Sequence, residues 1–159
     1  MLHTLAFSWI AVKWPLFGLL RASRQTGMVR RIAQERIALS MLTFAVCAAV
    51  VPFVAPAFLF RIGSHTPFVT TIVWAMLAAA TGIDLFVTIH AGLIQTGNRV
   101  SHLRPFVLTG LVNLGAAALL TRFFGPVGAL TSAIVCPMLM TIWWLPREAW
   151  RQLAEPDQL

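Results

Sequence analysis

Apolar residues in this chain come in long runs, without the polar interruptions of an amphipathic helix on a soluble protein. Five runs are found, covering residues 4–20, 37–60, 68–95, 104–121 and 126–145. A transmembrane helix needs about 20 apolar residues to cross a hydrocarbon core of roughly 30 Å. The pattern therefore predicts an all-α, polytopic membrane helix bundle with about five transmembrane segments.

The connections between these runs are short, which predicts a single membrane domain over residues 1–159. Residues 21–36 are expected to form a basic cytoplasmic loop, with a short amphipathic helix on anionic lipid as the second interpretation. Residues 146–159 are expected to form a cytoplasmic tail. The first segment is the weakest, because Lys13 and Pro15 interrupt it. Pro52 and Pro56 are expected to bend the far end of the second.

Composition supports the membrane class. Hydrophobic residues make up 58% of the chain and charged residues 11%, whereas soluble domains are about half apolar and a quarter charged. The net charge of +7 raises nucleic acid as a partner. The basic residues flank the apolar runs, however, and no basic patch is interleaved with aromatic residues, so we expect no nucleic-acid binding.

The basic residues predict the orientation, since Lys and Arg concentrate on the cytoplasmic side of membrane proteins. Arg61 and Arg122 fall on one side. The other side has nine arginines, namely Arg21, Arg24, Arg30, Arg31, Arg36, Arg99, Arg104, Arg147 and Arg151. We therefore expect an external amino terminus and a cytoplasmic carboxyl terminus.

Asp84 is the only acidic residue inside an apolar run. At 100° per residue, Thr81, Thr88 and Gln95 fall within about 60° of it, so one polar stripe follows the helix. Intramembrane acids face protein or water and are usually functional. The stripe predicts a helix lining a polar path, with Asp84 as a proton or cation site. The alternative is that these side chains bond to neighbouring helices.

Lys13 is the second charged residue inside a run. It could pair with Asp84, which would relieve the desolvation of both charges. It could also offer positive charge to an anionic substrate. If the first segment is not a true span, Lys13 instead extends to the membrane interface.

Asn113 and a set of small residues predict close packing of the last two segments. Gly110 shares the face of Asn113, while Gly128 and Ser132 form a pair of small residues four positions apart. Small residues allow membrane helices to approach, and amides bond across the contact. Gly125, followed by a proline, is expected to end one helix and start the next.

The sequence contains no motif that is typical of an enzyme active site. We find no nucleophile motif, phosphate-binding loop, paired carboxylates or metal-ligand cluster. Cys47 and Cys136 lie inside apolar runs and are interpreted as small buried side chains. We therefore expect neither catalytic activity nor a cofactor or metal.

The stretch "FGPVGA" (124–129), between a run containing Asn113 and a run rich in small residues, resembles the end of polysaccharide transporter proteins. These are the Wzx-type oligosaccharide flippases of the multidrug/oligosaccharidyl-lipid/polysaccharide superfamily. "WPLFGLLRASRQTGMVRRIAQERIALSM" (14–41) and "IHAGLIQTGNRV" (89–100) are similar to a cytoplasmic loop and to the stretch before the penultimate helix of that family. The resemblance covers about residues 8–146.

The resemblance implies that this chain corresponds to the last helices of a transporter of 12–14 helices. It implies transport of undecaprenyl-diphosphate-linked saccharides across the bacterial inner membrane by alternating access. A missing amino-terminal half or a second copy of the chain would then complete the path. The rival interpretations are a small structural membrane protein, an inactive remnant, and a small oligomeric multidrug-type pump.

Overall fold

The computed structural model describes residues 1–64, 67–97 and 103–154. Every regular element in these ranges is an α-helix. The helices are α1 (Leu2–Ala11), α2 (Trp14–Ala22), α3 (Thr26–Arg61), α4 (Thr71–Gln95), α5 (Leu103–Phe124), α6 (Pro126–Met140) and α7 (Trp144–Ala154).

Several helices are long and apolar enough to cross a membrane. They are α1 and α2 taken together, α3, α4 and α5, and the bent pair of α6 and α7 supplies a fifth crossing if it counts as one span. The prediction of an all-α, polytopic membrane helix bundle is confirmed. The chain is therefore described below as a multi-pass membrane protein.

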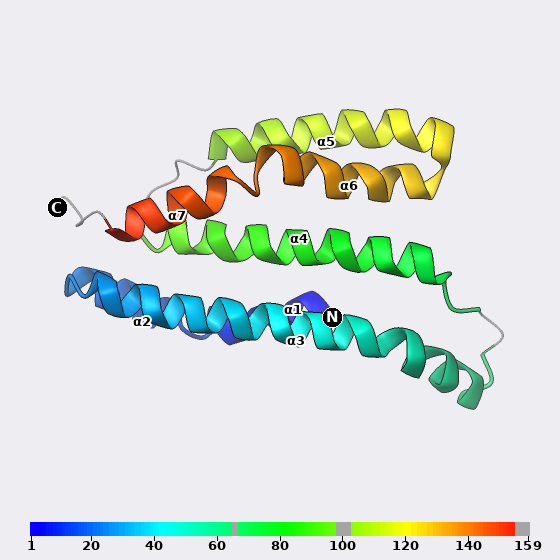
Figure 1. The fold of residues 1–159 in the computed structure, drawn as a ribbon, viewed down its shortest axis with the longest axis horizontal. Coiled ribbons are helices and arrows are strands. Elements are labelled where there is room, and N and C mark those ends of the chain that lie inside the picture. The colour runs from blue at the N-terminus through cyan, green and yellow to red at the C-terminus, as the bar shows by residue number, and fades with distance from the viewer. Residues whose placement is uncertain (65–66, 98–102, 155–159) are drawn as a thin grey trace.

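Helix α4 lies in the middle of the bundle, with α1 and α3 on one side and the hairpin of α5 and α6 on the other (Figure 1). Helix α5 packs mainly against α6, and α7 packs against α3 and α4. The α5–α6 hairpin turns at Gly125, whose φ of 60° favours glycine, and Pro126 starts α6.

The segment that we expected as a loop, residues 21–36, is helical from Thr26 onwards. Helix α3 has 36 residues and is thus about 54 Å long, more than a bilayer core requires. Its first turns contain good helix-forming residues, and Arg31 pairs with Glu35 one turn later at 3.2 Å. A helix that has formed in the apolar part therefore continues through the charged part.

Two expected single segments are interrupted. The first breaks at Val12 and Lys13, before the proline at the start of α2. The last breaks between α6 and α7, whose axes differ by 45°. There the amides of Thr141 and Ile142 both donate to the carbonyl of Pro137, at 2.9 Å each. Pro146, in the first turn of α7, has no backbone donor and its ring crowds the carbonyl four residues earlier, that of Ile142, so a continuous helix cannot run through this point.

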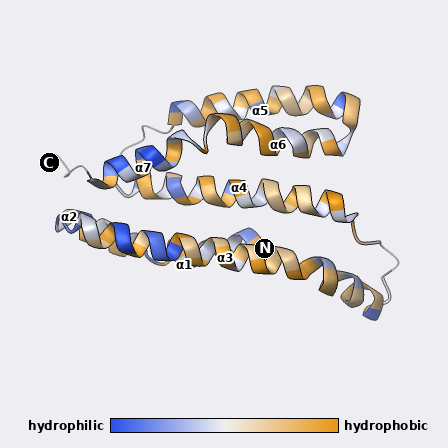
Figure 2. Ribbon diagram, viewed as in Figure 1, coloured by the Kyte–Doolittle hydropathy of each residue, from blue (hydrophilic) through white to orange (hydrophobic). Residues whose placement is uncertain are grey.

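Residues of the expected tail also form structure, because α7 continues to Ala154. Leu145, Ala149 and Leu153 recur at four-residue spacing and are buried in the common core. Helix α7 and the first third of α3 are the most hydrophilic parts of the ribbon, and both lie toward the same end (Figure 2).

The core fills one half of the bundle. The buried residues of α4 all fall between Leu85 and Ile94, and none lies in its first half. Phe17, Val29 and Leu145, from α2, α3 and α7, belong to the same cluster. The bundle is therefore tightly packed around the carboxyl-terminal half of α4 and loosely packed around its amino-terminal half.

Candidate functional site: a polar cavity between the helices

A cavity of about 420 Å³ lies beside the loosely packed half of α4. Its walls come from the start of α1, from α4, from the middle of α5 and from α6. The lining residues are His3, Leu77, Ala80, Thr81, Asp84, Val87, Asn113, Leu130, Ala133 and Pro137. Four of them are polar, in a cavity whose remaining walls are apolar.

Asp84 pairs with a residue that the sequence analysis did not single out. The Oδ2 atom of Asp84 lies 3.4 Å from Nε2 of His3, in α1. The Asp84 side chain is 69% exposed and that of His3 is 28% exposed, so the pair borders the open space of the cavity. Only the packing of α1 against α4 brings these two residues together, and no spacing in the sequence indicates it.

Lys13 does not occupy the expected place. It lies at the break between α1 and α2, outside the cavity lining. The neighbouring Trp14 ring fills the space beside Gly92 of α4 so closely that a Cβ there would overlap it. Gly92 is two helical turns beyond Asp84, about 12 Å along the axis. In the described residues no ion pair joins Lys13 to Asp84.

Only some residues of the polar stripe of α4 line the cavity, because the packing around the helix changes along its length. Thr81 lines the cavity, whereas Thr88 and Gln95 do not. Thr88 is half-buried and Gln95 is exposed near the end of the helix. The packed core begins at Leu85, so only the part of the stripe up to Asp84 lines the cavity.

Asn113 also lines the cavity, although we expected it at a helix contact. Its Oδ1 atom is buried and accepts no hydrogen bond within the part of the chain that the structure describes. A buried carbonyl without a donor costs about 1–3 kcal/mol. The amide therefore contributes an available acceptor to the cavity wall.

The small residues that we expected to pack behave differently from one another. A Cβ on Gly128 would overlap the backbone of Leu120 in α5, and Ser132 is 1% exposed on the same helix. These two residues lie where α6 meets α5. Gly110 is exposed and a Cβ there would meet nothing, so the structure gives it no contact that requires glycine. Gly125 forms the turn itself.

The cavity brings together a carboxylate, an imidazole, an amide oxygen and the Thr81 hydroxyl, which donates to the carbonyl of Leu77 at 2.8 Å. Nε2 of His3 lies 3.4 Å from Asp84 but makes no hydrogen bond within the described residues, whereas the Asp84 carboxylate and the Thr81 hydroxyl oxygen can accept hydrogen bonds from a polar solute. Within the described residues, no group of three or more His, Cys, Asp and Glu side chains could hold a metal ion.

Compared with known proteins, the chain matches no family model, no curated protein and no solved structure.

Proposed function

We propose that this chain forms part of the translocation path of a membrane transporter. The observation that supports the proposal is the cavity beside Asp84, His3, Thr81 and Asn113, within helices that are long enough to cross a membrane. Ionisable residues inside a membrane are expensive and mark solute or proton pathways. In a purely structural role these polar side chains would bond across helix contacts, whereas the Asp84 side chain is 69% exposed beside the cavity.

The uneven packing supports an alternating-access mechanism. The half of α4 from Leu85 to Ile94 is buried, and the half before it faces the cavity. In our proposal this conformation is closed at the arginine-rich, cytoplasmic end and open toward the opposite side. Transport then requires the packed half to separate and the open half to close.

For the transported class, we propose lipid-linked oligosaccharides, as the sequence resemblance implies. The Asp84 carboxylate and the Thr81 hydroxyl oxygen can accept hydrogen bonds from saccharide hydroxyl groups, and the amide nitrogen of Asn113 can donate to them. The exposed side of Asp84 leaves room for a further wall of the path, which we assign to a missing amino-terminal half or to a second copy. The inner bacterial membrane is the location that this function requires.

Transport by variants of the cavity tests the proposal. The gene is deleted in its own host and replaced by the wild type or by Asp84→Asn, and surface polysaccharide and lipid-linked precursors are quantified. Hydrogen bonds to charged groups contribute about 1.5–3 kcal/mol. We therefore expect Asp84→Asn to reduce export about tenfold or more, with accumulation of the lipid-linked precursor.

Two threonines of the same stripe provide a matched control. Thr81→Val removes a hydroxyl that lines the cavity, while Thr88→Val removes one outside it. Reduced export with the first variant and normal export with the second supports the path through the cavity. Normal export with both Asp84→Asn and Thr81→Val would exclude it. Altered drug susceptibility without any change in polysaccharide would favour a multidrug-type pump, and loss of a partner complex alone would favour a structural protein.

A further inference from the structure

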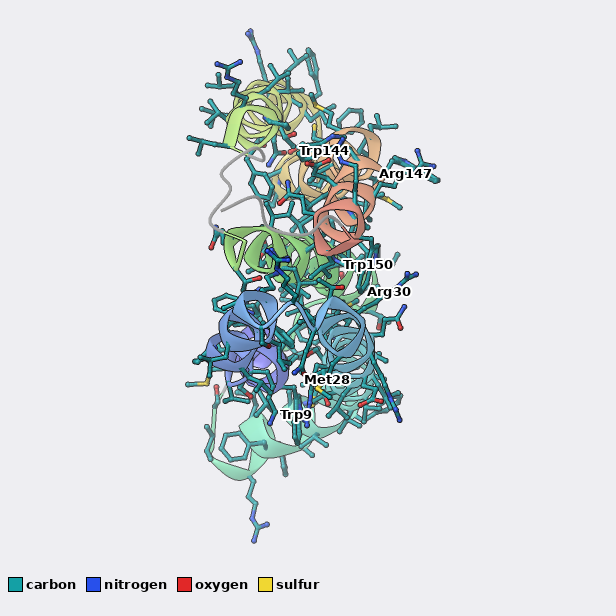
Figure 3. The ribbon with its side chains drawn as sticks, turned by 90° about the vertical axis from the view of Figure 1, so that its left-hand side faces the viewer. Trp9, Met28, Arg30, Trp144, Arg147 and Trp150 are labelled. Carbon is teal, nitrogen blue, oxygen red and sulfur yellow. The ribbon has the colours of Figure 1, made fainter. Side chains whose placement is uncertain are left out.

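One end of the bundle presents arginines and tryptophans from two helices that are far apart in the sequence. The arginine–tryptophan surface consists of six residues from α3 and α7: Arg30, Arg31, Trp144, Arg147, Trp150 and Arg151. Helix α3 packs against α7 at this end, and Figure 3 shows Arg30 beside Trp150 with Arg147 directed outward. This surface is separate from the cavity and is not used by the proposed transport.

Helix α7 turns its arginines away from the core. Leu145, Ala149 and Leu153 are buried on one face, while Arg147 and Arg151 are exposed on the other. An amphipathic helix with Arg on its polar face and Trp at its margin is typical of helices that lie at a membrane surface.

Within the part of the chain that the structure describes, two guanidinium groups of this surface have no carboxylate partner. Arg31 pairs with Glu35 and Arg151 pairs with Glu148, at 3.2 and 3.0 Å. Arg30 and Arg147 have no carboxylate at ion-pair distance among the described residues.

Trp150 contacts one of these two arginines and lies three residues from the other on its own helix. The Arg30 guanidinium lies over its ring, 5.9 Å from the ring centre. Arg147 precedes Trp150 by three residues on α7, so their side chains are neighbours on the helix surface. The free charges of α3 and α7 therefore flank one aromatic ring.

Helix lengths place this pair of charges at the level of lipid headgroups. The apolar part of α3 begins at residue 37. Arg30 precedes this point by seven residues, which is about 10 Å along the helix axis. Helix α6 covers about 22 Å from Pro126 to Met140, and the break at residues 141–143 leads to Trp144, so Trp144 lies toward the far side of a hydrocarbon core of about 30 Å. Arg147 lies a further turn beyond Trp144.

We propose that the arginine–tryptophan surface binds the phosphate of an anionic phospholipid, held between Arg30 and Arg147. Arginine forms paired hydrogen bonds with phosphate oxygens, and its planar group stays charged while stacked on an aromatic ring. The Trp150 ring fixes Arg30 and lies at the level where interfacial tryptophans are found. A bound lipid would join α3 to α7 from outside the core.

Lipid binding by the full-length chain tests this proposal. The purified protein is titrated in neutral detergent with phosphatidylglycerol or phosphatidylcholine, and bound lipid is measured by native mass spectrometry. We expect phosphatidylglycerol to bind in preference. Each arginine near an anionic lipid surface contributes about a fivefold change in affinity, so Arg30→Gln/Arg147→Gln should weaken this binding about 25-fold.

The matched control is Arg61→Gln/Arg122→Gln, which removes two exposed arginines from the opposite end. It should bind phosphatidylglycerol as the wild type does. Equal losses in both double variants would show a general effect of net charge and overturn the proposal, as would equal binding of phosphatidylcholine. Displacement of the lipid by millimolar inorganic phosphate would identify a site for the free anion instead.

A second double variant, Arg30→Lys/Arg147→Lys, keeps both charges and is the control for misfolding. It should bind phosphatidylglycerol more tightly than the glutamine variant because both charges remain, but less tightly than the wild type because lysine forms neither the paired hydrogen bonds nor the stacking. A loss as large as with glutamine would contradict a charge-based site. Because Asp84 is not involved, Asp84→Asn should bind the lipid normally. Failure of transport and failure of lipid binding are therefore distinguishable.

Discussion

Which side chains are neighbours in the cavity depends on the axial register of the packed helices. Asp84 lies beside His3 rather than Lys13, since α1 runs alongside α4 with its first turn at the level of Asp84. Each helical residue advances about 1.5 Å, so the ten positions from His3 to Lys13 carry the lysine about 15 Å away. The sequence identifies Asp84 as an unusual charge within an apolar run, but its partner depends on this register.

Gly128 offers a prediction at the same scale. Its replacement by Ala places a methyl group against the backbone of Leu120, which cannot move aside as a flexible side chain can. Overpacking of this kind costs about 1–3 kcal/mol. We expect Gly128→Ala to lower the free energy of unfolding by this amount, measured by reversible unfolding in mixed detergent micelles.

The control for Gly128 is Gly110→Ala, where the added methyl group meets open space. Alanine also favours the helix by up to about 1 kcal/mol, so this variant should be neutral or slightly more stable. If both alanine variants were equally stable, the close approach of α5 and α6 at Gly128 would be contradicted.

The hydrophobic pattern predicts which long helices are present but not where each of them begins and ends. The runs of apolar residues predict the presence of each long helix. They do not predict that α3 extends eleven residues further, from residue 36 back to Thr26, because that extension is polar and depends on helix propensity and an ion pair. They also miss the break before α7, where Pro146 cannot donate to the carbonyl of Ile142.

Arg21 connects two elements and provides a prediction at this scale. It is 5% exposed, and its Nη2 atom donates to the carbonyl of Leu93 at 3.0 Å. This carbonyl lies near the negative end of the α4 dipole. Replacement by Met removes a charged hydrogen bond of about 1.5–3 kcal/mol. We expect Arg21→Met to loosen α2 and accelerate deuterium exchange of its amides.

Arg24, three residues later, is exposed and serves as the comparison. Arg24→Met should change stability by less than about 0.5 kcal/mol and leave exchange in α2 unaltered. Equal exchange in the two variants would show that the contact between Arg21 and Leu93 does not hold α2 against α4.

For the whole molecule, the distribution of arginine predicts a cytoplasmic location of the end that contains α7. In a background without Cys47 and Cys136, we expect Ile62→Cys to react with a membrane-impermeant maleimide in intact cells. Ile62 is exposed just beyond α3, at the opposite end. Arg24→Cys should react only after the membrane is permeabilised.

Labelling in the reverse pattern would invert the orientation, and with it the direction in which we propose the cavity to open. Labelling of both cysteines in intact cells would contradict a membrane-spanning α3, because the two positions lie on either side of that helix. In the inverted orientation, the proposed lipid site would also lie away from the cytoplasmic leaflet, where anionic lipids concentrate.

The sequence alone determined the class of protein and the polar residues worth attention. Long apolar runs cannot be buried in a soluble domain of this size, and an acid within one of them needs a polar neighbour. Local composition carries this information, since hydrophobicity and charge act wherever the residue lies.

Only the tertiary structure decided how these residues are grouped. It joined His3 and Asn113 to Asp84, excluded Thr88 and Lys13 from the cavity lining, and brought Arg30 to Trp150. These groupings depend on the axial register of packed helices, on where α6 and α7 break, and on which half of α4 is covered. Each of them results from contacts between distant segments, which no local pattern encodes.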